Sequence, residues 1–247
     1  MSLLARRPLQ VALALVVGAA FMLAAVVMAF GPARANAEAK PYIVVIDAGH
    51  QKKANLHLEP IGPGSSKKKP KVSAGTRGVA TKKREATINL QVALKLRDEL
   101  EKRGVKVVMV RTKADVNIAN SERAKIANRA GADLLIRVHC DGSPKKSTHG
   151  LLVLVPGKNR WTGPILATSL QAGKDIQAAT LKTTKARNRG ISKRTDMTGF
   201  NWSKVPCVVV EMGVMTNAAE DRRLASSSYQ KKLVTGMADG AMRYLKR

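Results

Sequence analysis

The chain of 247 residues is long enough for an export segment followed by a single domain of about 200 residues with a substantial core. It contains 44 Lys and Arg against 17 Asp and Glu, which gives a formal net charge of +27 and favours a polyanionic partner. Aromatic residues make up only 3% of the chain, and no zinc-finger or arginine–glycine pattern occurs in it, which argues against nucleic-acid binding.

The beginning of the chain has the features of an export signal. Two arginines precede a long apolar run, and a pattern of alternating small residues ends at Ala35. We therefore predict a signal peptide over residues 1–35, a short linker over 36–40 and a catalytic domain over 41–247. The apolar run is also long enough to be an uncleaved membrane anchor, the only case in which we expect contact with a membrane. Either way the domain is secreted or associated with the cell wall, so the expected polyanion is an envelope polymer.

Three apolar strands are predicted to end in side chains suited to metal or proton chemistry. The strands and the residues that follow them are 42–46 with His50, 133–138 with His139, and 205–210 with Glu211. Unbroken β-branched runs of this kind are typical of strands covered on both faces of a sheet. Such strands carry their functional groups at the carboxyl end, where the sheet opens into a crevice.

A long polar segment, residues 51–84, follows the first strand. Its prolines, glycines and the lysine run at 67–69 predict a loop over the entrance of the site. Exposure to solvent explains any single lysine better, whereas the run as a whole is expected to attract an anionic polymer.

From Glu85 the pattern becomes helical, because apolar residues recur at every fourth position until Gly104. Glu85 therefore lies in the first turn of a helix, where a carboxylate complements the helix dipole. The preceding loop can also return this carboxylate to the end of the first strand.

The rest of the chain alternates strands with helices, so we predict an α/β architecture. Further strands are predicted over 105–110 and 150–155. A helix is predicted over 120–129 with Asn120 or Ser121 as its cap, and another over 161–180. Two more helices are predicted, one from Asn217 with a capping box to Glu220 and one from 226–228 to the end. We predict irregular structure over 182–194 and turns over 198–204.

Four further residues have two interpretations each. Cys140 and Cys207 are expected to be free thiols, because parallel strands hold them beyond bridging distance. Each is better explained as a small buried residue beside an apolar strand than as a nucleophile. Phe200 and Trp202 precede the strand that ends at Glu211. They can stack on a sugar or peptide, or belong to the local core.

His50, His139 and a carboxylate make a His-His-Glu set, which binds zinc and leaves a position open for water. Glu211 follows an apolar strand, where an ionised group needs a partner. We interpret it as a general base that moves a proton from the attacking water to the leaving amine. The alternative is a carboxylate that is paired with Arg189 or another arginine. Asp47 and Asp141 compete as ligands, but they fit an orienting or turn role at least as well.

Four segments together resemble a known family. They are VVIDAGH, TKKREATINLQVALKLRDELEKRG, SERAKIANRAGADLLIRVHCDGS and PCVVVEMGVMTNAAED. In this order they resemble the zinc-dependent N-acetylmuramoyl-L-alanine amidases of bacterial cell-wall turnover, the amidase type 3 family, over residues 42–247. By that resemblance His50, Glu85 and His139 match the zinc (Zn2+) ligands, and Glu211 matches the catalytic glutamate.

The resemblance implies a mixed, mostly parallel sheet with helices on both faces and the active site at the strand C-terminal ends. It also implies cleavage of the amide between N-acetylmuramic acid and L-alanine in peptidoglycan, with anionic wall polymers as further partners of the basic surface. Two alternatives stay open. One is a catalytically silent protein that binds muropeptides or anionic wall polymer, and the other is a zinc peptidase that acts within the stem peptide.

Overall fold

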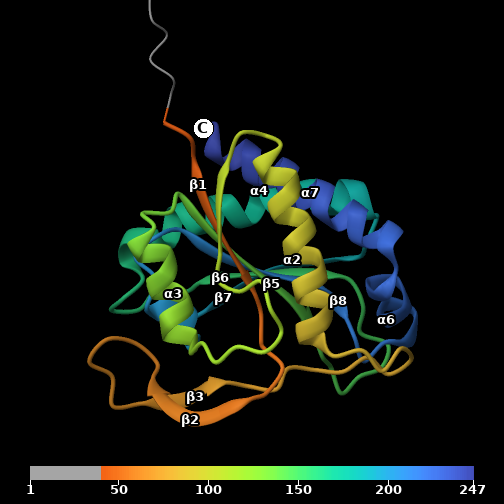
Figure 1. The fold of residues 1–247 in the computed structure, drawn as a ribbon, viewed down its shortest axis with the longest axis horizontal. Coiled ribbons are helices and arrows are strands. Elements are labelled where there is room, and N and C mark those ends of the chain that lie inside the picture. The colour runs from red at the N-terminus through yellow and green to blue at the C-terminus, as the bar shows by residue number, and fades with distance from the viewer. Residues whose placement is uncertain (1–39) are drawn as a thin grey trace, which may run out of the picture. The chain divides into compact units, whose positions relative to one another are not determined.

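A six-stranded sheet runs through residues 40–247, the part of the chain that the computed structural model describes (Figure 1). The strand order is β4-β1-β5-β8-β6-β7, and every neighbouring pair is parallel except β6 and β8. The strands are β1 (Ile43–Ala48), β4 (Lys106–Met109), β5 (Leu134–Asp141), β6 (Leu151–Pro156), β7 (Asn188–Arg194) and β8 (Cys207–Val214). The predicted mixed, mostly parallel sheet is confirmed.

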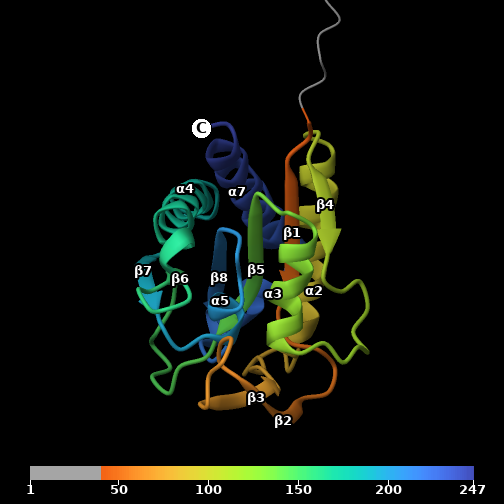
Figure 2. The ribbon, with the colours of Figure 1, turned by 90° about the vertical axis from the view of Figure 1, so that its left-hand side faces the viewer.

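Helices cover both faces of this sheet, as Figure 2 shows with α3 and α5 in front of it and α7 behind. Alternate side chains of each strand point to opposite faces and so contribute to two separate cores. Val44 and Ile46 pack in the core on the side of α2, α4 and α7, whereas Val45 packs in the core with α3 and α5. The helices are α2 (Glu85–Glu101), α3 (Asn120–Arg129), the 3-10 turn η1 (Gly163–Ile165), α4 (Leu166–Thr184), α5 (Thr198–Asn201), α6 (Ala218–Ala225) and α7 (Ser227–Leu245).

The segment 51–84, which we predicted to be a loop, contains an antiparallel hairpin of β2 (Asn55–Pro60) and β3 (Lys68–Val72). The prediction failed because most of β2 is exposed, so that no apolar alternation marks it. The hairpin is instead attached to the rest of the domain through a polar side chain of β2. The buried carboxylate of Glu59 accepts hydrogen bonds from the backbone N–H and the hydroxyl group of Ser121 in α3.

The prediction of irregular structure over 182–194 was also wrong. Helix α4 continues to Thr184, and residues 188–194 form the strand β7 at the edge of the sheet. An edge strand is only partly buried and tolerates charged side chains that discourage pairing with other chains. Because β7 is basic rather than apolar, its sequence did not indicate a strand. Among the described strands it pairs only with β6.

The predicted helix caps are correct in part. Asn217 caps α6, and its side-chain oxygen accepts hydrogen bonds from two backbone N–H groups of the first turn. Glu220 does not complete the capping box, because its carboxylate accepts from the backbone N–H groups of Gly150 and Val214. Helix α3 begins after Ala119, which has no side-chain cap bond.

Cys140 and Cys207 are buried and free, as predicted. The predicted signal peptide over 1–35 lies outside the described residues, as does the linker apart from Lys40. Residues 41–247 form one compact unit. Within the described part of the chain, we find no helix with the length and apolarity needed to span a bilayer.

A buried carboxylate joins β1, β5 and α3 beneath the carboxyl ends of the strands. Asp47 is fully buried and accepts hydrogen bonds from Nη1 of Arg123, at 2.6 Å, and from Nε of Arg137, at 2.8 Å. Burial acts to raise the pKa of Asp47, but the two guanidinium charges outweigh it and hold this pKa well below its usual range. The resulting stability is present above about pH 4, near the pKa of unfolded Asp, and is lost as the pH falls toward the folded-state value.

We expect Asp47→Asn to lower the free energy of unfolding at pH 7 by about 3–5 kcal/mol, because it leaves Arg123 and Arg137 buried without their counter-charge. The matched control is Asp115→Asn. Asp115 pairs with Lys52 on the surface, where its side chain is 66% exposed, and its loss is expected to cost less than about 1 kcal/mol. Denaturant titration of both variants measures the difference, and equal losses would contradict a structural role for the buried pair.

Candidate functional site

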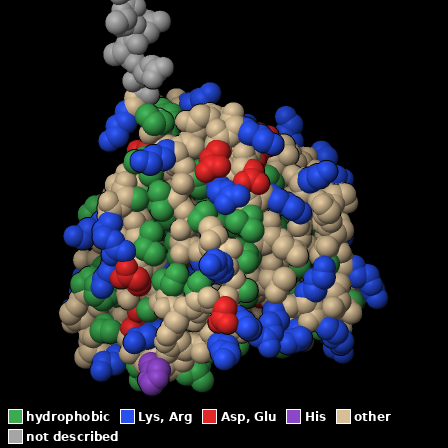
Figure 3. All heavy atoms as spheres, viewed as in Figure 1, with side chains coloured by type: hydrophobic (Ala, Val, Ile, Leu, Met, Phe, Trp, Pro, Cys, Tyr) green, Lys and Arg blue, Asp and Glu red, His purple; other side chains and the backbone are tan. Residues whose placement is uncertain are grey.

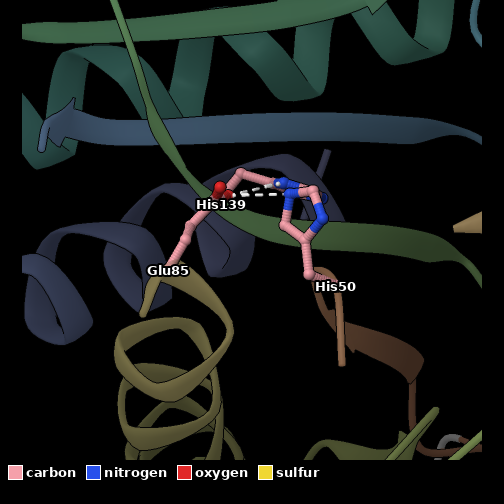
Figure 4. Close-up of side chains that lie close together, drawn as sticks. All are labelled: His50, Glu85 and His139. Carbon is pink, nitrogen blue, oxygen red and sulfur yellow. Dashed lines mark hydrogen bonds and ion pairs between the residues drawn. The ribbon is translucent and has the colours of Figure 1, made fainter. Parts of the chain in front are cut away.

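Three side chains from separate elements meet at the carboxyl end of the sheet (Figure 4). His50 follows β1, Glu85 begins α2 and His139 lies near the end of β5. Since β1 and β5 are parallel neighbours, their carboxyl ends lie side by side. One ligand atom from each residue lies within 4.8 Å of the other two, so the structure brings together the three predicted metal ligands.

The carboxylate of Glu85 lies between the two imidazole rings. Its Oε1 is 3.1 Å from Nε2 of His50 and 3.1 Å from Nδ1 of His139. The ring centroids are 4.9 Å apart, with an angle of 75° between the ring planes. Two nitrogens and one carboxylate oxygen therefore converge on one small volume, a donor set that suits zinc.

Backbone groups hold these side chains in place. Nδ1 of His50 donates to the carbonyl oxygen of Ser73 at 3.0 Å, which orients the ring so that Nε2 faces Glu85. Glu85 accepts from the backbone N–H groups of Thr76, at 2.8 Å, and Cys140, at 3.1 Å. His50 itself has a φ of 59°, an uncommon conformation outside glycine that is found at functional sites.

Two of the three charge states suit a cation, those of Glu85 and His139. Burial alone would raise the pKa of Glu85, but its hydrogen bonds with His139 and His50 lower it well below the usual range. Burial lowers the pKa of His139 and favours the neutral ring. Burial also acts to lower the pKa of His50, but the hydrogen bond and the charge of Glu85 outweigh burial and raise this pKa. Nε2 of His139 is buried against Gly49 and makes no hydrogen bond with any described residue, so the nitrogen that faces the cluster is Nδ1.

Glu211 lies beside this cluster. It pairs in register with His139 across β8 and β5, and both side chains line the same pocket. Burial, together with the charges of Glu85 and Asp141, raises the pKa of Glu211 well above its usual value. Its Oε2 is buried and has no hydrogen-bond partner among the described residues. A carboxylate in this environment can take up and release a proton.

The alternative that Glu211 is paired with Arg189 is not what the structure shows. Nη2 of Arg189 donates to Oδ2 of Asp141 at 2.8 Å instead. Asp141 and Asp47 thus each bind arginine, and neither belongs to the three-residue cluster.

Two segments form the walls of the pocket. One is β3 with Ser73, and the other is the connection from the end of β7 into α5. Nζ of Lys69 lies 2.9 Å from Oδ2 of Asp196, which joins the two walls at the rim. The hairpin that we predicted to be a loop is therefore a wall of the site.

The sequence analysis missed one pocket residue of interest, Arg137. It lies two positions before His139 in the same strand, so strand alternation alone places both on one face. Of the two aromatic residues considered, Phe200 is fully buried in the core. Trp202 donates its indole N–H to the carbonyl oxygen of Pro60 at 3.0 Å, outside the lining of this pocket.

Comparison with known proteins agrees with this geometry. Residues 44–243 match the family described as N-acetylmuramoyl-L-alanine amidase. An N-acetylmuramoyl-L-alanine amidase of Mycobacterium tuberculosis is 26% identical over 220 residues, covering 82% of this chain and 86% of that protein. The amidase AmiA of Escherichia coli is 26% identical over 242 residues, covering 82% of this chain and 75% of that protein.

Solved structures show the same fold. The crystal structure of the apo form of an N-acetylmuramyl-L-alanine amidase from Mycobacterium abscessus aligns with a TM-score of 0.73 and 27% identity, covering 83% of this chain and 98% of that one. An N-acetylmuramoyl-L-alanine amidase from Clostridium difficile aligns with a TM-score of 0.68 and 25% identity, covering 84% of this chain and 98% of that one.

The close approach of Gly49 to His139 yields a test of the site geometry. A Cβ at position 49 would overlap the imidazole ring of His139. We expect Gly49→Ala to displace this ring and to cost about 1–3 kcal/mol of unfolding free energy. Gly163→Ala is the control, because a Cβ there meets nothing within 4 Å. Thermal unfolding and the NMR shifts of His139 measure both effects, and an unmoved ring in Gly49→Ala would contradict this packing.

Proposed function

The chain belongs to the N-acetylmuramoyl-L-alanine amidase family of peptidoglycan hydrolases, and from this we propose that it is an exported zinc enzyme acting at the cell wall. The bond cleaved is the amide between N-acetylmuramic acid and L-alanine. The observation that carries the proposal is the convergence of His50, Glu85 and His139, two of which, His50 and His139, line one pocket with Glu211. A binding protein would have no need of a buried carboxylate beside such a cluster that no described residue pairs with.

We assign zinc binding to His50, Glu85 and His139. The set offers two imidazole nitrogens and one carboxylate oxygen, and it leaves room for a further ligand, as catalytic zinc sites require. The approach of Nε2 of His50 and Nδ1 of His139 to Oε1 of Glu85, together with the anionic state of Glu85, favours a cation here. Bound zinc supplies Lewis-acid polarisation of the scissile carbonyl.

Glu211 then handles the proton. Its carboxylate removes a proton from the attacking water and delivers it to the nitrogen of L-alanine as the amide bond breaks. The products are the free carboxylate of the muramic acid lactyl group and a stem peptide with a free amino terminus. The raised pKa of Glu211 makes its ionised form a stronger base toward the water, and its protonated form is the one that carries the proton to the leaving amine.

We expect Glu211→Gln to lower the rate of stem-peptide release by about 10²–10⁴-fold, since the amide side chain cannot accept the proton. A metal chelator is expected to abolish release from wild type. The control is Glu122→Gln on α3, where the side chain is 42% exposed and lies outside the pocket lining, and which should keep the wild-type rate. Mass spectrometry of digested peptidoglycan measures the products.

The identity of those products separates the amidase from its alternatives. Free stem peptides that begin at L-alanine support the amidase. Shortened peptides still attached to sugar would identify a zinc peptidase, and bound muropeptide without any product would identify a binding protein.

We further propose that residues 1–35 direct export and that the basic surface retains the enzyme on anionic wall polymer. Lys and Arg side chains outnumber Asp and Glu on the face in Figure 3, in keeping with the net charge of +27. Attraction of this kind acts through many exposed charges and is therefore sensitive to salt.

Retention of the domain 41–247 on purified walls is expected to fall steeply as salt is raised, because the screening length shortens from about 10 Å at 0.1 M to about 3 Å at 1 M. Sedimentation of walls with bound protein measures this retention. Walls stripped of anionic polymer serve as the control and should bind less protein at low salt. Retention that does not change with salt would exclude an electrostatic mechanism.

A further inference from the structure

Arg137 forms part of the floor of the site pocket. It lies on β5 on the same face as His139, and it lines the pocket together with His139 and Glu211. Only 3% of the residue is exposed, so its guanidinium group has lost nearly all contact with bulk solvent. A charge in such a position needs partners for its N–H groups.

Two of the three nitrogens of Arg137 have partners. Nε donates to Oδ2 of Asp47 at 2.8 Å, and Nη2 donates to Oδ1 of Asn120 at 2.9 Å. Nη1 donates to no residue of the described chain. It lies against Gly199, another lining residue, where an added Cβ would overlap it. The guanidinium group is thus fixed in orientation with one nitrogen available at the pocket floor.

Among the described residues, the two buried arginines beneath the floor form ion pairs with one and the same carboxylate. Asp47 supplies one negative charge to two buried arginines, Arg123 and Arg137. At the rim, by contrast, Lys69 and Arg194 both pair with Asp196. The floor therefore offers an oriented, buried cation with a free N–H group, which suits a carboxylate better than a neutral oxygen.

We propose that Nη1 of Arg137 binds a carboxylate of the stem peptide close to the scissile amide, and that the enzyme thereby prefers acidic stem peptides to amidated ones. The proposal rests on the proposed function, because it assigns the substrate class of the same site. Arg137 is then a residue that determines specificity, and its pairing with Asp47 and Asn120 holds it ready for the ligand.

Two ligands that differ in one carboxylate provide the test. They are N-acetylmuramoyl-L-alanyl-D-glutamate and the same compound with the α-carboxylate of glutamate amidated. Binding is measured by calorimetry in the Glu211→Gln chain, so that turnover does not interfere. We expect the acidic ligand to bind at least about tenfold more tightly, the effect of one hydrogen bond to a charged group.

Adding Arg137→Met should reduce the ratio of the two dissociation constants to about one, and Arg137→Lys should leave an intermediate preference. Arg194→Met is the matched control, since it removes a pocket arginine already paired with Asp196, and it should keep the ratio. Gly199→Ala displaces Nη1 while leaving Asp47 in place, and it should lower the ratio even if Arg137→Met fails to fold.

Equal binding of the two ligands, or a preference that survives both Arg137→Met and Gly199→Ala, would overturn the assignment. Hydrolysis of the two ligands by the wild-type chain is measured separately. Absence of hydrolysis would count against the proposed amidase activity, whereas the binding ratio reports on Arg137 alone.

Discussion

The site depends on the buried carboxylate of Asp47. This group binds one arginine from α3 and one from β5, directly beneath the turn that carries His50. Arg123 also donates to the backbone carbonyl groups of Ala48 and His50, so the same ion pair fixes the unusual backbone of the histidine. A buried charge cluster of this kind is costly to assemble and more costly to break. It therefore holds the end of the sheet in one arrangement.

Above this cluster, two glutamates beside the same pair of histidines have opposite properties. Glu85 lies between two imidazole rings and at backbone N–H groups, which keep it ionised. Glu211 is buried without such partners and near other carboxylates, which favours its neutral form. Environments that move two pKa values apart in this way commonly separate a charged ligand from a proton carrier. The same residue type thus presents an ionised carboxylate at one position and a readily protonated one at the other.

The sequence by itself determined the α/β class, the strands that carry His50, His139 and Glu211, and the helix that begins at Glu85. These signals are local, because buried parallel strands need unbroken apolar runs and an amphipathic helix needs a period near 3.6. The family resemblance rests on the same segments and is confirmed by the match over residues 44–243. Metal-ligand chemistry at three strand or helix ends could therefore be predicted before any contact was known.

Only the tertiary structure decided what surrounds those residues. The hairpin of β2 and β3 and the edge strand β7 are stabilised by contacts between distant segments rather than by an apolar pattern of their own. The same holds for the partners of polar groups. Asp141, not Glu211, binds Arg189, and the free nitrogen of Arg137 is defined by what Asp47 and Asn120 leave unused. Pairing among buried charges depends on distances across the fold, which the order of residues along the chain does not specify.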